Sequence, residues 1–597
     1  MGLVAAGLRK SLSLFAALAA AGAAACTGSV GAERPPGGGD TTPDPTMSGP
    51  AHTVGQDGLI RDANGNVLCD TKVKDCSAFT NGYDIRGGSM GRLNRNQYGR
   101  TIKDLLGSTL TPHYTFPDDE LAHGFDRIGA TLRVSPEHME QYLSAAEQLI
   151  NELFARPAGD PWRTRYITCD PATGPDCWRT VLTNFATKAW RRPPQPTEMD
   201  RFVTLVQTEA VDLMPEVALK SGMQAVLLSP YFMYRVELDP NIDDVTPHFV
   251  NSYEMATRLS YFLWGTMPDD ALFAAAAADA LSTPEGILAE FNRMLADAAR
   301  AQTLVDDFGA QWLNVYKIRS VTPDLATFPS FNDVLRESAV TETLMLVNEF
   351  FTTDQKISGL LTSSASYLNG PLAAHYGVPG VTGDAFVRVD LTGTTRRGLL
   401  THMSYLAGTS NPTRTSPVKR GKYVLERMLC SPPPDPPGNI DLNIDEGSGL
   451  ENLSVRDRLL KHQEKGAGCA SCHSIMDAIG LGLENYDGIG AYRTSDEYGP
   501  INATGTLPAA DGSGNVTFDG ASQLADILAA DERLVGCLAK NLLTFGLGRG
   551  FDPRDTGLLD VISAYARVSG GTFRSTLQTI LVSDAFRKRR ALLATEL

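Results

Sequence analysis

The sequence lacks several motifs that would assign an activity directly. Its 597 residues contain no His-Glu-x-x-His zinc motif and no phosphate-binding P-loop, so a metalloprotease or a nucleotide hydrolase has no support. Acidic residues outnumber basic ones by 69 to 53, and the formal net charge is −16. Such a chain repels phosphate backbones and offers no basic stripe, so we expect no nucleic-acid partner.

Strand-like sequence is also scarce. Residues 384–391 alternate only weakly, and the Gly-rich stretch from Tyr498 to Phe518 predicts at most a small hairpin. Elsewhere apolar residues recur at helical spacing, for example between Arg92 and Gly107, where the glycine predicts the end of a helix. Since the chain is too long for a single core, we predict a mainly α, multi-domain helical assembly.

The N-terminus predicts export. A basic pair precedes a short apolar run, which indicates a signal peptide over residues 1–25 that is too short to anchor in a bilayer. Cys26 stands at the small-residue cleavage point, as in a bacterial lipobox, and we expect it to carry a lipid. The alternative is plain secretion with an unmodified Cys26. The Gly- and Pro-rich segment that follows predicts a tether, so the protein is expected in the periplasm or at the outer membrane.

One motif carries recognisable chemistry, the string CASCH at residues 469–473. C-x-x-C-H is typical of covalent c-type haem attachment, in which Cys469 and Cys472 bind the haem edge and His473 coordinates the iron. A zinc site would need a second ligand pair, and no second C-x-x-C exists. A thioredoxin-like dithiol would need a strand before the motif, and none is predicted there. We therefore predict one haem c.

The second axial ligand of the iron is not evident. No Met follows Met476 and no His follows His473, and Met476 lies about one helical turn from His473, on the same side. A partner must then come from upstream, or the position is open to small ligands. The upstream candidates are the nearby residues with a thioether or imidazole group: His402, Met403, Met428 and His462.

Six cysteines remain after lipid and haem, an even number that fits three disulfides in an exported protein. Cys69 with Cys76 and Cys169 with Cys177 flank short polar loops, which favours local pairing. Cys430 and Cys537 would then close a long loop around the haem motif. The alternative is a set of buried free thiols.

Several segments of the sequence resemble segments that occur, in the same order, in a known group of proteins. RLNRNQYGRTIKDLLG, KAWRRPP, LLSPYFMYRVEL, NPTRTSPVKRGKYVLERMLCSPPPDPP and the block from CASCH to GAYR resemble the planctomycete-type and myxobacterial cytochrome-associated proteins. Those proteins carry the domains of unknown function catalogued as 1587, 1595, 1592, 1588 and 1585. The resemblance implies an exported haem protein without a known reaction.

The resemblance and the composition together suggest boundaries. We expect a signal peptide (1–25), a lipid tether and Cys-bearing linker (26–85), a 1587-like helical domain (86–156), a 1595-like domain (157–228), a 1592-like domain (229–378), a 1588-like haem-attachment domain (379–495) and a 1585-like helical domain (496–597).

Three functions follow as hypotheses. The first is electron transfer in the cell envelope with an exported redox partner protein, from a helical body with a C-terminal cytochrome c-like haem segment. The second is a haem-dependent oxidase or peroxidase-like enzyme, although a dihaem peroxidase would need a second C-x-x-C-H. The third is an envelope binding or scaffold protein with an accessory haem. The cluster RTSPVKRGK, which includes Arg420, is either a partner for haem propionates or the solvated start of a helix.

Overall fold

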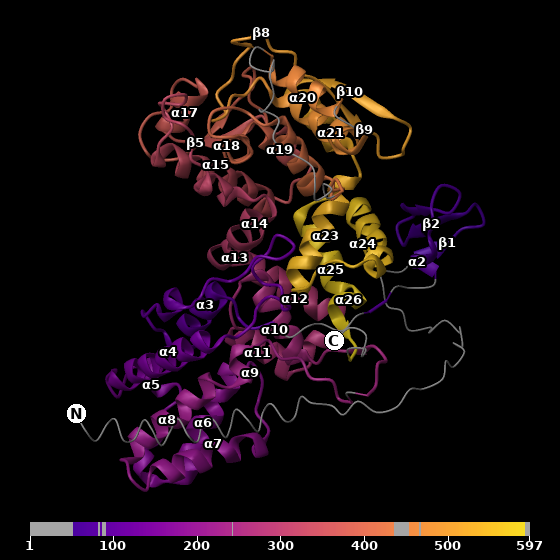
Figure 1. Cartoon of the computed structure of the whole chain (residues 1–597). Coiled ribbons are helices and arrows are strands. Elements are labelled where there is room, and N and C mark those ends of the chain that lie inside the picture. Colours follow the sequence, from indigo (N-terminus) through magenta and orange to yellow (C-terminus); the bar gives the residue numbers. More distant parts are fainter. Residues whose placement is uncertain are drawn as a thin grey trace. The chain divides into compact units, whose positions relative to one another are not determined.

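The computed structural model describes residues 52–80, 84–85, 91–241, 243–434, 453–464 and 467–591, and only the backbone of Thr80 and of residues 467–469. The predicted signal peptide, Cys26 and the first part of the tether lie outside the described residues. Helices dominate the rest, which confirms the prediction of a mainly α protein (Figure 1). In the part of the chain described here, no helix is both long and apolar enough to cross a membrane.

The first helices share one apolar core, in which Tyr98, Tyr142 and Phe185 are buried. Ser135 caps α4 with Pro136 in its first turn. As the sequence predicted, Gly107 ends α3, in the left-handed conformation that glycine adopts readily. The helices are α3 (Arg95–Leu106), α4 (Pro136–Ala155), α5 (Pro161–Thr164), α6 (Pro175–Ala189), α7 (Pro196–Glu209), α8 (Pro215–Leu227) and α9 (Pro230–Met233).

A second and larger core runs through the remaining helices, from Phe125 to Phe586. Its central part contains α10 (Ser252–Leu263), α11 (Asp270–Ala277), α12 (Pro284–Ala296), α13 (Ala298–Leu304), α14 (Ala310–Trp312), α15 (Asp333–Thr352), α16 (Gly359–Thr362), α17 (Gly370–Tyr376), α18 (Met403–Gly408) and α19 (Pro417–Tyr423). Its C-terminal part contains α21 (Ala467–Gly480), α22 (Gly520–Ala530), α23 (Arg533–Leu547), α24 (Thr556–Val568), α25 (Phe573–Val582) and α26 (Asp584–Arg587). Helix α20 (Val455–Gln463) lies outside this core, and its Leu459 forms a small separate cluster with Leu481.

The strands form small antiparallel sheets. The weak alternation near residue 384 becomes β6 (Val387–Asp390), which pairs with β5 (Ala365–Leu368). The predicted hairpin forms from β9 (Thr504–Pro508) and β10 (Asn515–Asp519), and Figure 1 places it beside α21. The short pairs are β4 (His248–Phe249) with β11 (Lys588–Arg589) and β7 (Ser495–Asp496) with β8 (Gly499–Pro500).

A three-stranded sheet precedes the helices, in a segment for which the sequence predicted no strands. It consists of β1 (His52–Val54), β2 (Leu59–Asp62) and β3 (Val67–Asp70), followed by α2 (Ser77–Thr80). Ile60 and Leu68 are buried against Tyr565 of α24. These strands are too short to stand out as a pattern, and packing against a distant helix stabilises them.

The three predicted disulfides are confirmed. Cys69 pairs with Cys76 and Cys169 with Cys177, across separations of 7 and 8 residues. Cys430 pairs with Cys537 across 107 residues and joins the chain after α19 to α23. Disulfides of this kind indicate an oxidising compartment, in agreement with the predicted export.

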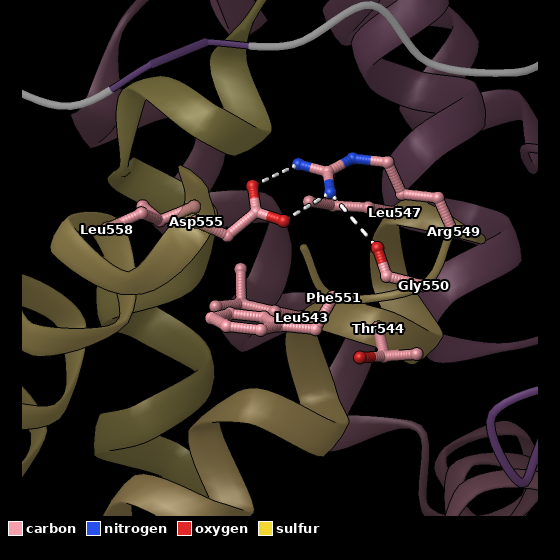
Figure 2. Close-up of a pocket in the computed structure, with 8 residues that line it drawn as sticks. All are labelled: Leu543, Thr544, Leu547, Arg549, Gly550, Phe551, Asp555 and Leu558. Atoms are coloured by element: carbon pink, nitrogen blue, oxygen red, sulfur yellow. Dashed lines mark hydrogen bonds and ion pairs between the residues drawn. The ribbon is translucent and has the colours of Figure 1, made fainter. Parts of the chain in front are cut away.

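A buried ion pair fixes the turn between α23 and α24. The guanidinium of Arg549 donates to both carboxylate oxygens of Asp555 at 2.7 and 2.8 Å. Figure 2 shows the two side chains pointing toward each other among the residues that line a small crevice. The crevice has a volume of about 10 Å³, which accommodates about one water molecule. The crevice is therefore too small for a larger ligand, and the role of the ion pair is structural: it fixes the start of α24 relative to the end of α23.

Candidate haem-attachment site

Helix α21 carries the CASCH motif and is pressed closely against α19. A Cβ atom on Gly421 would overlap the carbonyl oxygen of Met476, and one on Gly480 would overlap the carbonyl oxygen of Pro417. Glycine at both positions lets the two backbones approach, and Ile479 enters the main core from the same helix. The motif thus stands on a helix whose second half is packed tightly against α19 and the main core.

His473 is oriented by a carboxylate one helical turn later. Its Nδ1 lies 3.1 Å from both oxygens of Asp477, and Gln463 of α20 donates to Asp477 at 3.0 Å. The Asp477 side chain is only 1% exposed, whereas that of His473 is 13% exposed. The carboxylate therefore accepts the Nδ1 proton and leaves Nε2 as the nitrogen that can bind a metal.

The two cysteines of the motif are described unequally. Cys472 is a free thiol, partly buried against the main core, and it donates to the carbonyl oxygen of Pro434 at 3.7 Å. The backbone of Cys469 lies in α21, but its side chain is outside the described residues. A thiol that stays unpaired beside three disulfides is available for another covalent partner.

His462, one candidate for the second axial ligand, is buried at the end of α20 beside His473. The two ring centroids are 4.7 Å apart, at an angle of 60°. Two imidazoles on opposite sides of one iron have metal–nitrogen distances of about 2 Å each, which separates their ring centres by about 6 Å. The prediction for His462 therefore requires the two rings to move apart.

The other upstream candidates lie in the core. Met403 and Met428 are buried, and His402 is held by polar side chains. The Nδ1 of His402 lies 3.0 Å from the Thr343 hydroxyl, and its Nε2 lies 3.4 Å from that of Ser366. Burial, with a smaller effect of the Arg396 charge, lowers the pKa of His402 to about 3. This histidine is therefore neutral and engaged at both nitrogens.

The same polar network contains a carboxyl group that no motif in the sequence marks. Glu342 of α15 is fully buried and accepts hydrogen bonds from Tyr376 and Ser366, both at 2.7 Å. Its Oε1 lies 3.6 Å from Nε2 of His402. Burial raises the pKa of Glu342 to about 7. No local pattern marks it, because its partners come from positions up to 60 residues away along the chain.

Arg420, in the basic cluster of RTSPVKRGK, takes neither of its predicted roles. Its side chain is fully buried and donates to the carbonyl oxygens of Leu483, Tyr486 and Asp487 at 2.7 to 2.8 Å. It is neither solvated nor available to a propionate. It ties the loop after α21 to α19 and thereby supports the helix that carries the motif.

Asp477 is the residue of this site that the sequence could have revealed. It stands four positions after His473, which is the spacing that brings two side chains together on a helix. The described residues hold no group of three His, Cys, Asp or Glu side chains that could bind a bare metal ion.

Five family models match the chain in order, each described as a protein of unknown function. They are DUF1587 over residues 92–155, DUF1595 over 177–237, DUF1592 over 250–378, DUF1588 over 396–496 and DUF1585 over 514–586. The DUF1588 match contains α21 and the CASCH motif. No curated protein and no solved structure matches the chain.

Proposed function

The chain belongs to the family of proteins built from DUF1587, DUF1595, DUF1592, DUF1588 and DUF1585, and from this premise we propose that it is an exported lipoprotein that carries one covalent c-type haem and transfers electrons in the cell envelope. Cys469 and Cys472 would form the thioether bonds, and His473 would bind the iron. The lipid on Cys26 would hold the protein at the membrane, where an exported redox protein is the expected partner.

The residues present fit such a group. Helix α21 spaces the two cysteines by about one turn, and Cys472 is unpaired although six other cysteines form disulfides. When bound, a haem supplies a one-electron couple between ferrous and ferric iron. The chain itself holds His473 in one tautomer, supports α21 through α19 and keeps the attachment helix against the core.

The observation that carries the proposal is the contact of His473 with Asp477. A carboxylate at 3.1 Å from Nδ1 fixes the imidazole plane and makes Nε2 a stronger donor to a metal. A histidine that served only as a surface residue would have no need of a partner that is 1% exposed. The buried carboxylate is therefore best explained by a role for His473 as a ligand.

A haem-dependent oxidase or peroxidase-like enzyme is the second candidate, and one observation favours it. Both ring nitrogens of His402 are already engaged, which leaves fewer upstream residues free to complete the iron coordination. An open position would bind small ligands such as oxygen or peroxide. Carbon monoxide distinguishes the two functions, since it binds a reduced five-coordinate haem readily and a six-coordinate carrier weakly.

Haem attachment is tested by replacing both motif cysteines. The Cys469→Ala, Cys472→Ala variant, matured with cytochrome c assembly factors, should lose all haem that resists denaturation, because no thioether can form. Haem staining of a denaturing gel measures this. The Cys169→Ala, Cys177→Ala variant is the matched control, which loses a disulfide but should keep its haem. Retention of covalent haem by the motif variant would eliminate the proposal.

The role of Asp477 is tested separately. Asp477→Asn should keep the covalent haem but raise its reduction potential, because a neutral amide makes His473 a weaker donor and stabilises ferric iron less. Potentiometric titration followed at the haem absorption bands measures the shift. An unchanged potential in a variant with intact haem would show that the carboxylate does not act on the iron ligand.

A further inference from the structure

A ligand-sized cavity has no residue of the haem-attachment helix α21 among the described residues that line it. Its volume is about 630 Å³, within the range of about 300 to 1,000 Å³ that is usual for small-molecule sites. Three segments far apart in the sequence form its walls: α3 with the loop 121–126, residues 306–316, and Arg427. These segments lie within the matches to DUF1587, DUF1592 and DUF1588, and ligand sites often occur at such junctions.

Irregular backbone shapes one wall. The helix that begins at α13 widens into a π-turn over Val305–Gly309, and Asn314 adopts a left-handed conformation with φ of 49°. A π-turn inserts an extra residue into the helix and often marks a functional site. Here it places Asp306 and Asp307 in succession on the cavity wall.

The inner surface of the cavity holds polar groups in fixed pairs. Arg100 donates to both oxygens of Asp307 at 2.6 and 2.7 Å. Gln311 donates to the Asp126 carboxylate at 3.1 Å and accepts the Asp126 backbone N–H at 2.9 Å. Burial and the charge of Asp307 raise the pKa of Asp126. Donors and acceptors are thus oriented before any ligand arrives, which lowers the entropic cost of binding.

The outer rim is more exposed and chemically mixed. Asp306, Asn314 and Tyr316 are exposed there, and Leu121 is 69% exposed, so the rim combines polar groups with apolar faces. Arg427 lines the cavity with no carboxylate partner among the described residues. The carboxylates of Asp126, Asp306 and Asp307 would repel an anion. The guanidinium groups of Arg100 and Arg427 would repel a cation.

We propose that this cavity binds a neutral saccharide of about one to two sugar rings. Sugar hydroxyls donate and accept at once, which matches a surface of carboxylates, amides and guanidinium groups held in fixed orientation. The C–H face of a sugar ring can pack on Leu121 and on the face of the Tyr316 ring opposite Arg319, whose guanidinium lies 4.3 Å from the centroid of that ring. This inference goes beyond the proposed haem function and does not depend on it.

The test uses four neutral disaccharides, cellobiose, maltose, xylobiose and mannobiose, titrated into the full-length protein at up to millimolar concentration. Isothermal titration calorimetry and saturation-transfer NMR measure binding, and lysine and glutamate serve as charged probes. At least one disaccharide should bind at a single site. The Cys469→Ala, Cys472→Ala variant should bind it equally well, since the cavity lies apart from the motif.

Two variants locate the site. Asp306→Asn and Tyr316→Ala should each weaken binding by about tenfold or more, because the first replaces a charged acceptor by a weaker neutral amide and the second removes the ring on which the sugar packs. Asp212→Asn and Tyr114→Ala, exposed positions outside the cavity, are matched controls and should bind as the wild type does. The proposal is overturned if no disaccharide binds, if binding ignores both cavity variants, or if only lysine or glutamate binds.

Discussion

Replacing Cys430 and Cys537 by alanine should lower the free energy of unfolding by about 4 to 5 kcal/mol. The disulfide joins residues 107 apart, and the loop that it closes contains α20, α21 and the β9–β10 hairpin. Closing so long a loop removes many conformations from the unfolded chain, so the unfolded state gains entropy when the bond is lost. We expect a large effect although only one covalent bond changes.

The Cys69→Ala, Cys76→Ala variant is a matched control, because that disulfide closes a loop of only 7 residues. Its loss should cost about 2 kcal/mol on the same entropy argument. Urea titration of the oxidised proteins, followed by circular dichroism, gives both values. Equal losses in the two variants would mean that local packing, rather than loop length, determines what these disulfides contribute.

The second large effect concerns pH and Glu342. A pKa raised from 4.5 to about 7 corresponds to about 3 kcal/mol. Below pH 4.5 the carboxyl group is protonated in both the folded and the unfolded chain and has no effect. Between pH 4.5 and 7 the unfolded chain releases this proton while the folded chain keeps it. Stability is therefore lost as the pH rises through this window.

The variant Glu342→Gln should remove this dependence. Its free energy of unfolding should exceed that of the wild type by about 3 kcal/mol at pH 8, and the difference should shrink towards pH 4.5. The comparison cancels the opposite effect of His402, whose lowered pKa costs stability as the pH falls from 6.5 towards 3. Urea titrations at several pH values, on both proteins, measure the difference.

Glu349→Gln on the same helix is the matched control. Arg388 donates to Glu349 and lowers its pKa, so this carboxylate stabilises the folded state above pH 4.5 and loses its effect as the pH falls. The two glutamates should therefore give difference curves of opposite sign. A flat difference curve for Glu342→Gln would mean that its carboxyl group ionises normally in the folded protein.

The sequence by itself determined features that depend on neighbouring residues. Each of these signals lies within about one helical turn of the chain: the start of α4 at Ser135 and Pro136, the end of α3 at Gly107, and the CASCH motif. The disulfides at Cys69 and Cys169 were predictable because each pair flanks a short loop, and the third pair then followed from the count. The contact of Asp477 with His473 could have been predicted in the same way, from the spacing of four residues between them.

Only the tertiary structure decided which distant side chains meet. Arg420 belongs to a cluster that suggested an anion partner, yet its fully buried guanidinium holds three backbone carbonyl groups after α21. In the sequence, Glu342 looks like an ordinary polar residue of a helix. In the structure it is buried, because Tyr376 and His402, which come later in the chain, lie against its carboxyl group. The cavity between Arg100, Asp307 and Arg427 arises in the same way. Local signals fix elements within a few residues, whereas burial and polar contacts depend on how whole helices pack, and no short pattern encodes that.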